Sequence, residues 1–113
     1  MTESFYNLQI NNDSDLTLQT GSADISNQLM LTLGNINTNS TNTLTISNTA
    51  TNAVVGGGVN SFVNGPLRKA INNGSSFTFP VGDAISSSRK RYGYVSVFTT
   101  TTSGTQQIGR AHV

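Results

Sequence analysis

The chain carries short apolar pairs at alternate positions, separated by clusters of residues that favour turns. The pairs occur in NLQI, DLTL, QLMLTLG and NTLTIS, and in each of them the apolar side chains point to one face of a strand. Between them lie NNDSD, TGSAD and NINTNSTN, whose polar side chains bond to neighbouring backbone groups and suit tight turns. No helix of ordinary length fits this pattern, so the sequence predicts an all-β fold.

The apolar positions recur at a spacing typical of a solenoid, with about three inward positions in each stretch of roughly 20 residues. A parallel β-helix buries such pairs by stacking coil on coil, whereas a sandwich buries them between two antiparallel sheets. Regular hairpin signals would favour the sandwich, but NNG at 72–74 and GNI at 34–36 do not punctuate the chain regularly. We therefore expect parallel β-helix coils over residues 1–63. The side chains expected to point inward are Leu8, Ile10, Leu16, Leu18, Leu31, Leu33, Leu44 and Ile46.

The composition limits the chemistry and the compartment. Asn, Ser and Thr fill 44 of the 113 positions and charged residues only 10%, so the surface is neutral and rich in hydroxyl and amide groups. The absence of cysteine excludes disulfides and thiolate metal sites. The first residues, MTESFYNLQINN, lack the basic start and apolar run of a signal peptide, and no stretch approaches membrane-spanning length. We expect no membrane span and an internal fragment of any secreted parent protein.

The stretch from residue 56 to residue 82 changes character. Residues 56–58 are all glycine, and Pro66 lacks an N–H donor and disfavours helical geometry at Gly65. Beyond it, SFTFPVG and YGYVSVF are typical of strands. We expect a second, truncated β-sandwich-like unit over residues 64–107, with Arg68 and Lys69 at the surface. The structural joint between the two units is expected at Phe62, Gly65, Pro66, Phe79, Pro80 and Gly82.

The order NSFVNGPLRK, FTFPVGD and RYGYVSV resembles a pattern in large surface and secreted proteins of Bacteroidetes bacteria, the kind that carry a type IX secretion sorting signal. In that family β-helical coils lead to Ser-Phe-Val-x-Gly-Pro-Leu with a basic residue after it, then Phe-Pro-Val-Gly, then an aromatic-led strand. Asn60–Arg68 and Phe79–Gly82 match, whereas Gly93 follows Tyr92 where the family usually has Pro. The resemblance implies a secreted or cell-surface parent whose neighbouring modules are the partners, and it places no catalytic residue on these motifs.

Few residues offer catalytic or metal-binding chemistry. The sole histidine, His112, is penultimate, so no His-based triad or His-rich metal site can be assembled. Asp13 and Asp15 could form a carboxylate pair or, with Asp24, a weak calcium site, but aspartates in such segments usually cap turns. A polysaccharide-cleaving β-helix would need charged residues at coil spacing, where Asn, Thr and Gln stand instead. We expect no catalysis, no cofactor and no metal.

The basic triplet at residues 89–91 is too short for a nucleic-acid footprint and is typical of a solvated loop tip, so no nucleic acid is expected. Arg91, Tyr92 and Tyr94 are the first candidates for contact with a ligand, because tyrosines stack on sugars. The sequence predicts a structural spacer or stalk module of a secreted or cell-surface bacterial protein. An adhesin or glycan-binding module that uses exposed Asn, Thr and Tyr is the alternative.

Residues 108–113, IGRAHV, differ in texture from FTTTTSGTQQ before them. Translated backwards they give ATC GGA AGA GCA CAC GTC, which resembles the start of a common short-read sequencing adapter. We expect this segment to be adapter read-through from a metagenomic fragment, with no function for Arg110 or His112.

Overall fold

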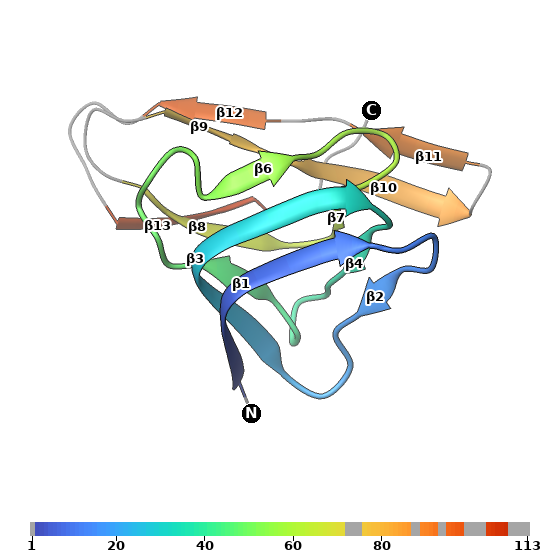
Figure 1. The fold of residues 1–113 in the computed structure, drawn as a ribbon, viewed down its shortest axis with the longest axis horizontal. Helices are drawn as coiled ribbons and strands as arrows, with labels where there is room; N and C mark the ends of the chain where they lie inside the picture. The colour runs from blue at the N-terminus through green and yellow to red at the C-terminus, as the bar shows by residue number, and fades with distance from the viewer. Residues whose placement is uncertain (1, 72–75, 87–88, 93–94, 99–103, 109–113) are drawn as a thin grey trace.

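The computed structural model describes residues 2–71, 76–86, 89–92, 95–98 and 104–108, and the side chains of residues 3–71 and 77–82 (Figure 1). Every regular element in these ranges is a β-strand. The strands are β1 (Thr2–Asn11), β2 (Leu16–Thr17), β3 (Ser22–Leu33), β4 (Ile36–Asn37), β5 (Leu44–Ile46), β6 (Val54–Gly56), β7 (Val63–Asn64), β8 (Leu67–Ile71), β9 (Ser76–Phe79), β10 (Val81–Ser86), β11 (Arg89–Tyr92), β12 (Val95–Phe98) and β13 (Gly104–Ile108).

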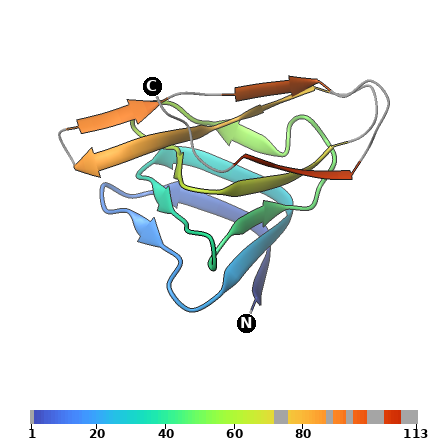
Figure 2. The ribbon, with the colours of Figure 1, turned by 180° about the vertical axis from the view of Figure 1, so that it is seen from behind.

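Parallel pairing between successive coils defines the architecture. In one sheet β1, β3, β5 and β8 pair in parallel, and in the other β2, β4, β7 and β10 do the same. The chain passes from one sheet to the other and back, so each round trip makes one coil of a β-solenoid (Figure 2). The predicted all-β fold with parallel β-helix coils is confirmed.

Two long strands supply two sides of a coil each. Residues 23–25 of β3 pair with β5, whereas residues 29–31 of the same strand pair with β6. The register between β1 and β3 shifts between Phe5 and Asn7, at the corner that separates these two runs. A coil therefore has three straight sides, and the third side is a strand of the second sheet.

The repeat length explains why the sequence periodicity is irregular. Leu16 pairs with Ile36, 20 residues further on, and Ala23 pairs with Leu44, 21 residues further on. Ile36, however, pairs with Val63, 27 residues further on, because β6 and the glycine-rich turn after it are inserted into that coil.

The sheets continue beyond residue 63, where we expected the coils to end. β8 adds to β5 in parallel, and β10 adds to β7 in parallel. The antiparallel pairs come next: β13 on β8, β11 on β10 and β12 on β9. The division of the chain into units 1–63, 64–107 and 108–113 stays a prediction, and residues 109–113 lie outside the described part.

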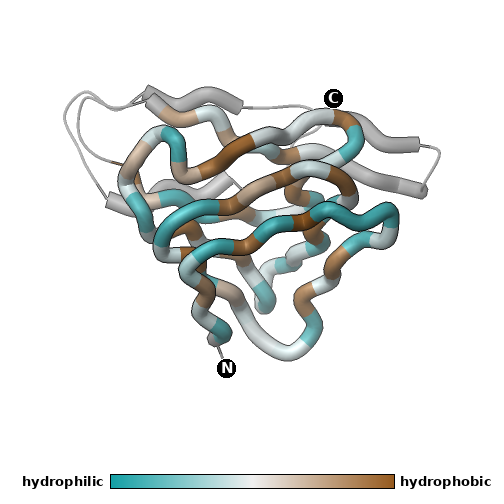
Figure 3. The backbone as a smooth tube through the Cα atoms, in the orientation of Figure 1, coloured by the Kyte–Doolittle hydropathy of each residue, from teal (hydrophilic) through white to brown (hydrophobic). Residues whose placement is uncertain are grey.

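Inward side chains form columns that run from coil to coil and alternate with polar positions along each strand (Figure 3). One column is Ile36, Val63 and Val81 beneath Leu16, and another is Leu44 and Leu67 beneath Ala23. Four of the predicted inward residues are buried and two are partly buried against the core. The buried ones are Ile10, Leu31, Leu44 and Ile46, and the partly buried ones are Leu8 and Leu18.

The prediction for Leu33 is wrong, and that for Leu16 needs a correction. Leu33 is 39% exposed because a register shift after Ile10 moves the end of β3 off the inward face, and Leu29 holds the core position instead. Leu16 lines the interior of the first coil but is 38% exposed, because among the described residues no further coil covers it.

Replacing Leu29 by Ala should lower the free energy of unfolding by about 3 kcal/mol, because the side chain is fully buried and leaves a cavity. Leu33→Ala is the matched control on the same strand and should cost less than about 1 kcal/mol. Urea unfolding monitored by circular dichroism measures both. Equal losses in the two variants would show that the register of β3 is wrong.

Candidate functional site

The predicted ligand contacts belong to β11 and the residues after it. The backbone of Arg91 pairs with Asp83, and that of Tyr92 pairs with Gly82. The side chains of Arg91 and Tyr92, and all of Tyr94, lie outside the described residues. A ligand contact at these three residues therefore stays a prediction.

The aspartates of the first coils lie at separate places. Asp15 Oδ1 accepts a hydrogen bond from the backbone N–H of Asn35 at 3.0 Å. Asp24 lies on β3 beside Thr45 of β5, and its buried Oδ1 atom has no hydrogen-bond partner within the described part. Among the described residues no three acidic or histidine side chains gather in a group that could hold a metal ion.

Asp15 begins a series of corner residues that link one coil to the next. Asn35 occupies the same corner one coil on, is fully buried, and accepts the backbone N–H of Phe62 at 3.1 Å through its Oδ1 atom. The side-chain oxygen of each coil therefore satisfies a backbone donor of the following coil, which would otherwise be costly to bury. The chemistry of these carboxylate and amide groups is structural.

The expected joint begins at a close contact between coils. Phe62 and Leu67 are both fully buried, which agrees with the packing expected from the sequence. Gly65 has a φ of 131°, and a Cβ atom there would collide with the carbonyl oxygen of Thr38. The Thr38 hydroxyl donates a hydrogen bond to the carbonyl of Pro66 at 2.8 Å. Glycine is required at residue 65 because the neighbouring coil leaves no room for a side chain.

The second half of the joint joins β9 to β10. Phe79 is fully buried and meets Phe77 edge to face, with ring centroids 5.1 Å apart and an interplanar angle of 82°. The carbonyl of Pro80 accepts the backbone N–H of Val63 at 2.8 Å. Gly82 pairs with Asn64 in parallel on one side and with Tyr92 antiparallel on the other. The direction of strand pairing in this sheet therefore reverses across Gly82.

The surface position expected for Lys69 is wrong, whereas Arg68 is exposed as expected. Lys69 is fully buried and stands in the inward column below Ile25 and Ile46. Alternation along β8 explains this: Leu67, Lys69 and Ile71 share the inward face, so the strand period outweighs the preference of a cation for water. The period-2 pattern in LRKAI was the signal that could have revealed it.

The ammonium group of Lys69 is held by backbone oxygens and an aromatic ring. Nζ donates to the carbonyl of Asn48 at 2.5 Å and to that of Ala70 at 2.7 Å. It also lies 4.8 Å from the centroid of the Phe77 ring, a cation–π distance. Desolvation by burial lowers the pKa of Lys69 from 10.5 to about 8.

The lowered pKa of Lys69 makes stability depend on pH in the alkaline range. Between about pH 8 and 10.5 the unfolded chain holds a proton on Lys69 that the folded chain has released, so the free energy of unfolding should rise with pH there. The rise is on the order of 3 kcal/mol at most, at about 1.4 kcal/mol for each pH unit. Lys69→Met should abolish it, as urea unfolding at several pH values would show.

Arg68→Met is the control for Lys69→Met, because Arg68 is the exposed neighbour on the same strand. This variant should keep the alkaline rise in stability. Identical pH profiles for the natural chain and Lys69→Met would mean that the lysine is solvated in the folded protein.

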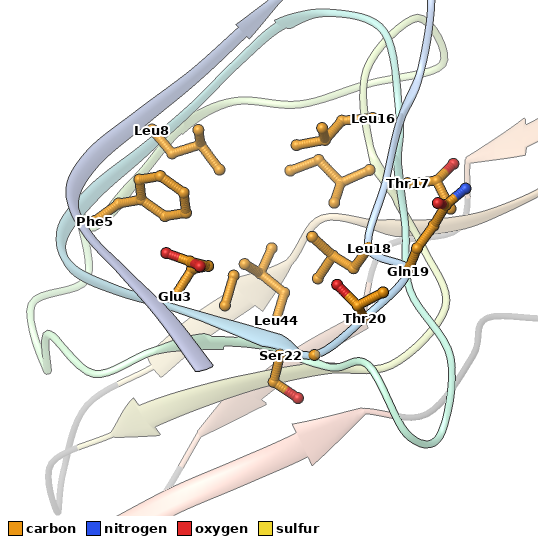
Figure 4. Close-up of a pocket in the computed structure, with 13 residues that line it drawn as sticks. Glu3, Phe5, Leu8, Leu16, Thr17, Leu18, Gln19, Thr20, Ser22 and Leu44 are labelled. Carbon is orange, nitrogen blue, oxygen red and sulfur yellow. The ribbon is translucent and has the colours of Figure 1, made fainter. Parts of the chain in front are cut away.

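The largest apolar opening lined by described side chains is at the first coil. It is an open cavity of about 180 Å³, into which Phe5, Leu8, Leu16 and Leu18 point from opposite sides (Figure 4). Its remaining lining residues form the floor and the rim. These are Glu3, Thr17, Gln19, Thr20, Gly21, Ser22, Ala23, Ile36 and Leu44.

No helix in the described part of the chain is long and apolar enough to cross a membrane. A comparison of the chain with protein families, curated proteins and solved structures finds no match.

Proposed function

We propose that this chain is a structural spacer or stalk module of a secreted or cell-surface bacterial protein, without catalysis. The observation that supports this function is the use of outward polar side chains to bind one coil to the next. Asn37 Nδ2 donates to the Thr17 hydroxyl at 3.0 Å, and Asn37 Oδ1 accepts from Asn64 Nδ2 at 3.1 Å. This ladder crosses three coils on the outer face of the second sheet.

A second ladder runs over the other sheet. Asn27 Nδ2 donates to Asn7 Oδ1 at 2.7 Å, and Asn48 Nδ2 donates to the carbonyl of Asn27 at 2.8 Å. Chains of hydrogen bonds of this kind strengthen one another and stiffen the stack along its axis. Amides that are engaged in the stack are less free to bind a ligand, so the pattern fits a rigid spacer better than a binding surface.

The compartment in this proposal is supported by sequence alone. The segments NSFVNGPLRK and FPVG resemble those of Bacteroidetes surface proteins with type IX sorting signals. The partners of a spacer are then the neighbouring modules of its own parent chain. The sequence of the uninterrupted gene tests this directly, because it should encode a signal peptide upstream and a sorting domain downstream.

Asn37→Ala should lower the free energy of unfolding by about 1–2 kcal/mol, because it removes two ladder hydrogen bonds and leaves Asn64 without one partner. Asn60→Ala is the matched control, since the Asn60 side chain is exposed and takes part in no ladder. Thermal unfolding followed by calorimetry measures both losses. A neutral Asn37→Ala would remove the support that the ladder gives to the spacer function.

A glycan array separates the spacer from an adhesin. The chain should bind no glycan on the array if its surface amides serve only to stack the coils. Glycan binding that disappears in Tyr92→Ala and Tyr94→Ala would contradict the spacer function and establish the adhesin. Release of products from a polysaccharide, lost on replacing Asp13 or Asp15 by Asn, would establish an enzyme instead.

A further inference from the structure

The two ends of the solenoid are built differently. At one end the sheets stop with parallel edge strands, because β1 pairs only with β3 and β2 only with β4 among the described strands. At the other end antiparallel strands follow, β13 on β8 and β11 on β10. Figure 1 shows β1 and β2 on the side of the molecule away from β11 and β12. Unpaired backbone groups of both sheets therefore meet at the β1–β2 end, which we call the open end.

The open end has the side-chain pattern of an interface between coils. Leu16 is 38% exposed, whereas Ile36 and Val63, which stand below it in the same column, are fully buried. Phe5 is likewise 38% exposed above the fully buried Ile25. These side chains already point into the stack, so the cavity of about 180 Å³ between them is the upper half of an intercoil layer.

Glu3 adds a charge to this layer. The register places it at an inward position, above Ala23 and Leu44, and Figure 4 shows its carboxylate beside Phe5 at the cavity. An inward carboxylate can be covered at low cost only by a cation that pairs with it. The interior of this solenoid already accommodates one inward cation, Lys69.

We infer that the open end docks one further parallel coil of the same polypeptide, which carries a Lys or Arg at the inward position above Glu3 and aliphatic residues above Phe5 and Leu16. The inference rests on the proposed spacer function, because it names the neighbouring module at this end. It continues a pairing that the structure already shows three times in each sheet.

A second copy of this chain fits the open end less well than a coil. Two open ends related by a two-fold axis would pair β1 with its own copy in antiparallel fashion. Residues 1–20 contain no Lys or Arg, only Glu3, Asp13 and Asp15 as charged residues. Such a dimer would cover Glu3 without supplying a cation, whereas a separate coil is free to carry one.

The test extends the full chain by a copy of residues 22–42 placed directly before Thr2. In the observed register this puts the copies of Ala23, Ile25 and Ile36 above Glu3, Phe5 and Leu16. The extension should raise Tm by roughly 5 °C or more. It should also slow hydrogen exchange in β1 by about tenfold or more, because the edge becomes an interior strand. A scrambled copy of the same composition is the control and should do neither.

Three versions of the copied coil then probe the charge. Ala23→Lys in the copy should give the highest Tm and Ala23→Asp the lowest, and Glu3→Gln in the chain should abolish this order. Equal Tm values for the Lys and Asp versions would overturn the requirement for a cation.

An extension no better than its scrambled control would overturn the docking of a coil. Concentration-dependent dimerisation of the unextended chain, abolished by Leu16→Asn in sedimentation experiments, would assign the open end to a second copy instead. These outcomes are independent of the glycan array, so the spacer function can fail while the coil still docks.

Discussion

The register between successive coils is the constraint on which the rest of this structure depends. A single alignment sets three things at once: which backbone groups pair, which side chains share an inward column, and which corner residue reaches the next coil. Asp15 and Asn35 illustrate this, because each accepts a backbone N–H about one coil further along the chain. A shift by one residue would expose the columns and break the corner hydrogen bonds together. Stability and register are therefore the same property here.

The strands and their parallel stacking could be predicted because both follow from local patterns. Alternating apolar residues predict strands, and the lack of regular hairpin signals favours coils over a sandwich. Leu33 escaped prediction because the register shift after Ile10 is a property of two strands together, and no local pattern in β3 marks it. The continuation of both sheets into β8 and β10 was missed for the opposite reason: Pro66 and the glycines suggested a break, but the backbone bends there without leaving the stack.

The candidate sites were less predictable than the fold. Lys69 was placed at the surface because its charge was given more weight than its position in LRKAI, although Asn48, Ala70 and Phe77 together stabilise its ammonium group in the interior. The open end could not be identified from sequence at all. Leu16 and Phe5 look like any other core residues, and only the order of strands shows that they belong to the outermost coil.

The spacing between paired strands also determines how this chain closes its contacts as it folds. Most parallel contacts join residues 20 to 23 positions apart, so each coil closes a loop of nearly the same length on the coil before it. The longest of these loops, the 27 residues from Ile36 to Val63, costs only about 0.3 kcal/mol more in closure entropy than one of 20. No coil is a large kinetic barrier in itself, and structure can spread from whichever pair of coils forms first, as along a one-dimensional chain of equal links.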